Sequence, residues 1–101
     1  MTIKNKIEKW KNNKTSFFFF LPDGPYGRPF DNQYVIESIG LSRDGLEIIF
    51  SDDIVLRFSG EPQLLTEDDK IRIIDFKELL FIVKGKILKQ YAHGDVTING
   101  F

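Results

Sequence analysis

The sequence has no cysteine and only one histidine, His93, so few of the side chains that most often carry catalysis or bind metals are present. Without cysteine, these 101 residues can form no disulfide bond, thiolate nucleophile or cysteine-ligated metal site. A single histidine would need several carboxylate partners to hold a metal, and no local spacing of Asp and Glu supplies them. We therefore expect no metal and no other cofactor.

Catalytic and phosphate-binding motifs are also missing. No glycine-rich phosphate loop precedes a helix, and no G-x-S-x-G sequence occurs. His93 lies in a short polar stretch typical of a turn, and it could act as an acid or base only beside Asp23 or Asp31. We expect a non-enzymatic protein, with a hydrolase that uses Asp23, Asp31 and His93 as the enzymatic alternative.

Long apolar runs are absent as well. The basic N-terminal segment is followed by an apolar run, Phe17 to Leu21, of only five residues. A secretory signal needs about 7 to 15 apolar residues and a membrane helix about 20. The sequence therefore predicts a cytoplasmic protein that has no membrane partner.

Charge is divided unevenly along the chain. Residues 1–14 hold five lysines against Glu8, and residues 15–101 hold nine Lys and Arg against fourteen Asp and Glu. The first segment thus carries +4 and the rest −5, so the basic segment could steer a partner or dock on the acidic body, and we expect it to dock. A chain without a basic excess is a poor nucleic-acid binder, and we expect no nucleic-acid partner.

The apolar periodicity predicts a single domain, 1–101, with one core. Within residues 1–13, Ile3, Ile7 and Trp10 share one stripe of a short amphipathic helix. Residues 15–101 read as a mainly β body in an α+β chain. The fold class that we predict is an antiparallel meander that forms a small sandwich or a partly open barrel.

Two hairpins can be aligned from their apolar residues. Leu41 should pair with Leu46, which places Ile39 opposite Ile48. The alternating strands 46–50 and 54–58 should pair through a three-residue connection.

The second half of the chain is harder to interpret. Gly60, Glu61 and Pro62 should break the strand that precedes them. Residues 76–91 fit either a helix or a hairpin with Ile82 opposite Ile87, and we favour the hairpin. A last short strand should span Val96 to Ile98, followed by a turn at Asn99-Gly100.

Four consecutive phenylalanines, Phe17 to Phe20, leave no polar face on the first strand. Such a strand should be central in the sheet and covered on both faces. At the edge of a sheet it would invite pairing with another chain, so a homodimer through an edge strand is possible.

A polar loop follows this strand. Three prolines and two glycines between Pro22 and Pro29 exclude regular structure and predict a stiff loop over residues 21–33. Stiff surface loops often carry binding residues, and this one offers a carboxylate, a phenol, a guanidinium and an amide. The candidate binding residues are Asp23, Tyr26, Arg28, Asp31 and Asn32. In the alternative interpretation the loop is a structural turn in which Arg28 pairs with Asp23 or Asp31.

The segment LPDGPYGRPFDN, Leu21 to Asn32, resembles a loop between the first two strands of a set of small uncharacterised bacterial β-rich proteins. The resemblance implies a small cytoplasmic protein without an established catalytic role, and it adds no site residue. From the residues themselves we expect a protein-interaction module, similar to an immunity protein or an inhibitor, that binds a partner such as a basic toxin or enzyme. The alternative is a β-barrel that binds a small ligand, with an anionic group contacted by Arg28.

Overall fold

The computed structural model describes residues 3–25, 34–42 and 45–100, which form one helix and eight strands. The elements are α1 (Ile3–Lys11), β1 (Phe17–Leu21), β2 (Gly24–Pro25), β3 (Ile36–Ser42), β4 (Gly45–Phe50), β5 (Ile54–Thr66), β6 (Lys70–Val83), β7 (Lys86–Tyr91) and β8 (Val96–Gly100). All strand pairs are antiparallel, and the spatial order is β2-β1-β8-β6-β5-β4-β3, with β7 also paired to β6. The predicted mainly β fold is confirmed.

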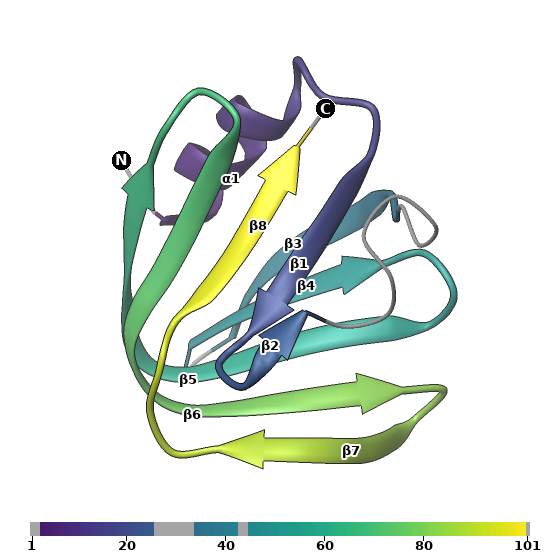
Figure 1. Cartoon of the computed structure of the whole chain (residues 1–101), viewed down its shortest axis with the longest axis vertical. Helices are drawn as coiled ribbons and strands as arrows, with labels where there is room; N and C mark the ends of the chain where they lie inside the picture. Colours follow the sequence, from purple (N-terminus) through teal and green to yellow (C-terminus); the bar gives the residue numbers. More distant parts are fainter. Residues whose placement is uncertain (1–2, 26–33, 43–44, 101) are drawn as a thin grey trace.

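The two long strands β5 and β6 bend together, and each takes part in both halves of the sheet (Figure 1). One half joins them to β4 and β7, and the other joins them to β8 and then β1. The register shifts at Gly60, where φ is +87°, and Asp75 on the facing strand has φ +59°. The expected break at Gly60–Pro62 is therefore wrong, because pairing resumes at Gln63 after the shift. The glycine turns the strand without ending it.

The two ends of this curved sheet meet at one point. Tyr34, just before β3, forms a bridge with Phe17 at the start of β1. Each residue donates its backbone N–H to the carbonyl of the other, with both N–O distances 2.7 Å. The sheet is therefore an open, curved antiparallel sheet that approaches a partly open barrel, one of the two forms that the sequence predicted.

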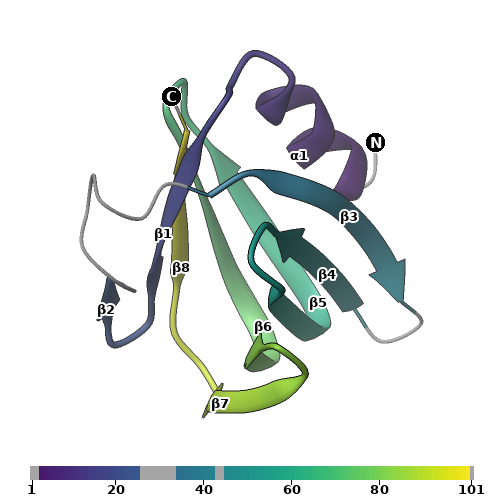
Figure 2. The same ribbon diagram turned by 90° about the vertical axis from the view of Figure 1, so that its right-hand side faces the viewer.

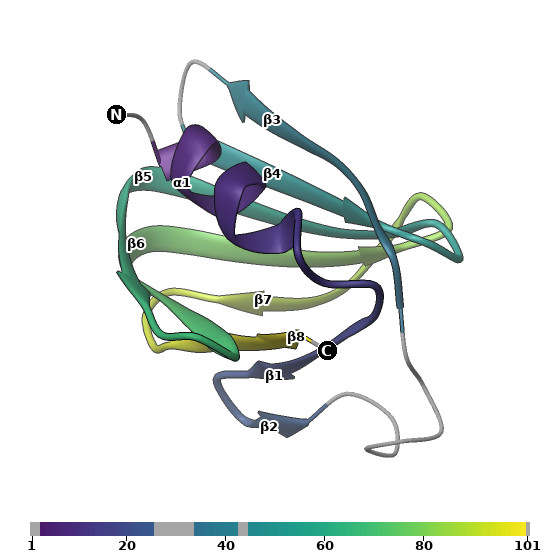
Figure 3. The same cartoon turned by 90° about the horizontal axis from the view of Figure 1, so that it is seen from above.

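Helix α1 lies inside the opening of this barrel, near β3 and β5 (Figures 2 and 3). Ile7 is fully buried, and Ile3 and Trp10 pack against the core from the same stripe. The Trp10 indole N–H donates to the Glu67 carbonyl at 3.1 Å, and Lys14 donates to the Asp68 carbonyl. The expected docking of the basic segment is thus confirmed, although these bonds go to backbone oxygens of the acidic turn.

The phenylalanine strand β1 is fully buried on one face only, whereas the sequence predicted burial on both faces. Phe17 and Phe19 face the core, whereas Phe18 and Phe20 are half-buried on the outer face, with ring centroids 5.5 Å apart. β1 pairs with β8 on one side and with the two-residue β2 on the other, so it lies close to one end of the sheet. The expectation of a central strand covered on both faces is wrong, because β1 lies one strand from the end of the sheet and Phe18 and Phe20 on its outer face stay partly exposed.

The predicted hairpins are present in the predicted registers. Leu41 pairs with Leu46, and Ile82 pairs with Ile87, so residues 76–91 form the end of β6 and all of β7. The helical alternative for that segment is wrong. The β4–β5 hairpin supplies six buried residues to the core: Leu46, Ile48, Phe50, Ile54, Leu56 and Phe58. Among the described residues, no buried side chain is polar or charged.

Strand β8 runs through Asn99 and Gly100, where a turn was expected. Gly100 pairs with Phe17, and its N–H donates to the Asp69 carbonyl at 2.8 Å. A Cβ atom at Gly100 would lie 3.0 Å from the Trp10 ring. The glycine therefore allows the helix to pack closely against the sheet, and the predicted turn at Asn99-Gly100 is wrong.

Candidate functional site

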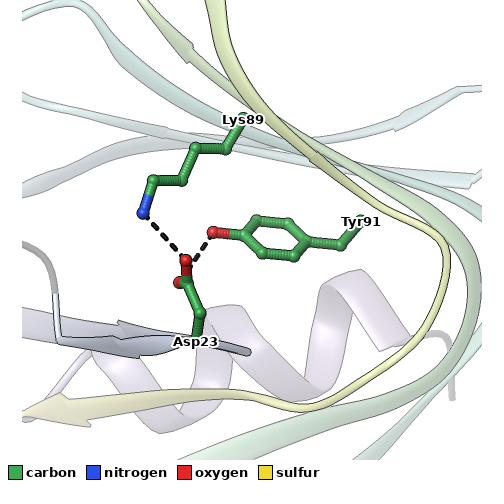
Figure 4. Close-up of polar contacts among 3 residues, drawn as sticks. All are labelled: Asp23, Lys89 and Tyr91. Atoms are coloured by element: carbon green, nitrogen blue, oxygen red, sulfur yellow. Dashed lines mark hydrogen bonds and ion pairs between the residues drawn. The ribbon is translucent and has the colours of Figure 1, made fainter.

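Asp23 is the candidate residue whose surroundings the structure describes, and it lies in the turn between β1 and β2. Its carboxylate contacts two side chains of β7 (Figure 4). Lys89 Nζ donates to Asp23 Oδ2 at 2.9 Å, and the Tyr91 hydroxyl donates to Asp23 Oδ1 at 2.8 Å. Since β7 and the β1–β2 turn share no strand pairing, these side-chain bonds join two separate parts of the barrel.

The pleat of β7 explains why Lys89 and Tyr91 reach the same carboxylate. The two residues are two positions apart, so their side chains leave the strand on one face. Their partners on β6 are Phe81 and Leu79, both buried, which identifies this face as the inner one. The pair therefore lies at the rim of the core, where Tyr91 is half-buried and Lys89 is exposed.

A glycine allows the β1–β2 turn to approach this rim. Gly94 follows β7 with φ +126°, and a Cβ atom there would lie 2.7 Å from Pro22 Cβ. A larger residue would need an unfavourable backbone conformation and would push Pro22 away. The position of Asp23, the next residue, thus depends on close packing as well as on its polar bonds.

The pKa values of Asp23 and Tyr91 both lie far from neutral pH. The hydrogen bond from Lys89, followed by that from Tyr91, holds the pKa of Asp23 below its ordinary value of 3.8. Burial raises the pKa of Tyr91 above its ordinary value of 10.0, and the hydrogen bond to Asp23 adds to this effect. At neutral pH the carboxylate is ionised and the phenol protonated, so the cluster acts as an anchor and is poorly suited to proton transfer.

The other end of the 21–33 loop is anchored in the core. Tyr34 is only 5% exposed, and its ring centroid lies 5.6 Å from that of Phe19 and 6.3 Å from that of Phe50. Its backbone bonds to Phe17 fix the same point. The segment between β2 and Tyr34 is therefore tied to the barrel wall at its two ends.

The other four candidate binding residues, Tyr26, Arg28, Asp31 and Asn32, lie outside the described residues. The expected pairing of Arg28 with Asp23 or Asp31 falls there too. Lys89 and Tyr91 were not identified as site residues from the sequence. They lie 66 and 68 positions from Asp23, and no local pattern connects them.

The enzymatic alternative gains no support from Asp23. Among the described residues, the hydrogen bonds to its carboxylate come from Lys89 and Tyr91, and none comes from His93. His93 is exposed in the connection between β7 and β8. No group of three or more His, Asp or Glu side chains in the described ranges could hold a metal ion.

The barrel interior near the phenylalanine strand is filled with aromatic rings. The ring centroid of Phe19 lies 4.9 Å from that of Phe50 and 6.0 Å from that of Phe81. These rings occupy the space in which the ligand-binding alternative would place a cavity.

The fold and the site define a small antiparallel β domain with an apolar interior and polar anchors at its rim. Comparisons with protein-family models, with curated protein sequences and with solved structures found no match. In addition, no helix in the described part of the chain is long and apolar enough to cross a bilayer. The resemblance of the loop to that of small bacterial proteins stays a prediction.

Proposed function

We propose that this domain is a non-enzymatic interaction module that binds a protein partner through residues 21–33, in the manner of an immunity protein or an inhibitor. The supporting observation is a pair of anchors near the two ends of the loop. The Asp23 side chain bonds to Lys89 and Tyr91 of β7, and the Tyr34 backbone bonds to Phe17 of β1. A binding segment that is already fixed at its ends loses less conformational entropy when a partner binds. Such an arrangement suits a dedicated recognition loop.

The charge of the domain indicates the kind of partner. The docked residues 1–14 offset +4 of the −5 that residues 15–101 carry, so the acidic charge open to a partner is local, at the exposed turns Asp52-Asp53 and Glu67–Asp69. A basic surface on the partner would be attracted to this body, which would speed association and make it sensitive to salt. A basic toxin or enzyme is therefore the class of partner that we propose.

The proposal can be tested with the double variant Tyr26→Ala and Arg28→Ala. A partner captured from the native host would be purified, and its affinity for the native and variant domains measured by calorimetry. Loss of two central contacts should weaken binding by about tenfold or more, while the melting temperature stays unchanged. A matched double variant on the bent strands, Gln63→Ala and Lys77→Ala, should keep the native affinity, because both residues are exposed and belong to β5 and β6 instead of residues 21–33.

Two outcomes would contradict the proposal. If the loop variant unfolds, the loop has a structural role. If it folds and binds the captured partner as tightly as the native domain, the partner uses another surface.

A further inference from the structure

Strand β7 forms an open edge of the sheet. Among the described residues it pairs only with β6, and Figure 1 shows it at the bottom rim of the molecule. Five of its six residues are exposed, including two large apolar ones, Ile87 at 58% and Leu88 at 54%. An edge strand presents unpaired backbone N–H and C=O groups to which another extended chain can bond.

An apolar row leads across the outer face of the sheet to this edge. Ile49, Val55, Ile82 and Ile87 are successive register partners on β4, β5, β6 and β7, and a register shift between Phe81 and Ile82 turns Ile87 to the opposite face from Lys89 and Tyr91. The first three line a hollow of about 560 Å³. The outer face of an antiparallel sheet is commonly polar, so an apolar row that ends at an open edge indicates a contact surface.

The charged residues of β7 and of the turn before it are all basic, although Asp53 lines the same hollow as Lys84 and Glu78 of β6 accepts a hydrogen bond from Gln90. Residues 84–91 contain Lys84, Lys86 and Lys89 and no acidic residue. Lys89 already binds the Asp23 carboxylate, whereas within the described ranges no carboxylate pairs with Lys84 or Lys86. Asp23 thus shows how a carboxylate is bound at this strand, and two further lysines are placed to do the same.

A second copy of the chain fits this edge poorly. Antiparallel pairing of β7 with β7 of another molecule would bring the lysines of both strands together, and like charges across a strand pair are destabilising. The occupant that the charges favour is an acidic strand of a different protein.

We propose that an extended acidic segment of a partner protein adds to β7 as a further strand. Its backbone would bond to the open edge, its apolar side chains would cover Ile87 and Leu88, and its carboxylates would meet Lys84 and Lys86. This surface has the opposite charge to the acidic body and does not include the 21–33 loop. The inference therefore stands independently of the proposed function.

The test is a selection of displayed random peptides, each of roughly ten residues, on the immobilised full chain; this length exceeds that of an average strand. Enriched peptides should alternate acidic and apolar residues. A synthetic peptide of the enriched sequence should slow hydrogen exchange at the β7 amides that point away from β6. The variant Lys86→Glu should weaken its binding by about tenfold or more, as expected for a strong charge-assisted contact.

The matched control is Lys9→Glu, a charge reversal at an exposed lysine of α1, at the opposite end of the molecule from β7 (Figure 1). This variant should bind the peptide as the native chain does. The proposal is overturned if no peptide is enriched, if the enriched peptides lack acidic residues, or if Lys86→Glu binds them normally. A dimer of the native chain that Lys86→Glu dissociates would also overturn it, by identifying a second copy as the occupant.

Discussion

Tyr91 donates its hydroxyl hydrogen to the Asp23 carboxylate over 2.8 Å, and so joins the last residue of β7 to the turn after β1, 68 positions earlier. Lys89 reaches the other oxygen of the same carboxylate from the same face of β7. The two bonds fix the start of the loop that we propose as the binding segment.

The Asp23 carboxylate should give the stability of the protein a distinct dependence on acid pH. Because its pKa is lower in the folded state than the ordinary 3.8, its contribution is present above pH 3.8 and is lost as the pH falls through the folded value. Asp23→Asn should therefore lower the melting temperature at neutral pH, and the difference from the native protein should shrink below pH 3.8. Thermal unfolding of both proteins from neutral pH to below pH 3.8 measures the difference in melting temperature. A difference that does not change with pH would show that the ion pair contributes nothing to stability.

The Tyr91 phenol should give the opposite sign at alkaline pH. Its folded pKa is raised, so its contribution is present below pH 10.0 and is lost as the pH rises through the folded value. In a titration of phenolate absorbance, the native protein should contain one tyrosine that ionises at a higher pH than an ordinary tyrosine, and Tyr91→Phe should remove it. Asp23→Asn should bring that ionisation closer to 10.0, because one cause of the shift is removed. An ordinary titration of Tyr91 in the native protein would contradict the geometry in Figure 4.

The phenylalanine strand should show two very different mutational costs. Phe19 is 1% exposed and touches the rings of Tyr34, Phe50 and Phe81, so Phe19→Ala should reduce the free energy of unfolding by about 3–5 kcal/mol. Phe18→Ala, on the half-buried outer face, is the matched control and should cost clearly less. Urea unfolding of the two variants measures the difference. Equal costs would indicate that the strand is covered on both faces.

A pair of glycines in the β3–β4 hairpin tests the closeness of β4 to β5. A Cβ atom at Gly45 would lie 1.9 Å from the Phe58 carbonyl oxygen, whereas at Gly40 it would meet no atom within 4 Å. Gly45→Ala should therefore destabilise the protein by about 1–3 kcal/mol through overpacking. Gly40→Ala should leave the urea midpoint almost unchanged. If both substitutions are tolerated, the strands are farther apart than described.

The hairpins were predictable because their registers depend on neighbouring residues. Leu46, Ile48 and Phe50 can face the core together with the next strand in only one alignment, since a shift by one residue exposes them all. The same reasoning placed Ile82 opposite Ile87. Local sequence is sufficient wherever a short turn joins two alternating strands.

Features that depend on distant residues were not predictable from the sequence. The pairing of Phe17 with Gly100 joins the first strand to the last, and no local sequence pattern predicts it. Gly60 suggested a strand end, but Lys70–Val83 bends along with it, and the pairing resumes at Gln63 after a register shift. At the site, composition selected Asp23, whereas its partners follow from the bend of β6 that carries β7 to the β1–β2 turn.

The proposed function rests on a loop that the barrel holds at its two ends, and native-state amide hydrogen exchange tests this most directly. The N–H groups of Phe17 and Tyr34 each bond to the other's carbonyl at 2.7 Å. We predict that both amides exchange as slowly as those of the buried β4–β5 hairpin. Exchange of the Tyr34 amide as fast as that of the exposed Asp52 turn would contradict the anchored loop.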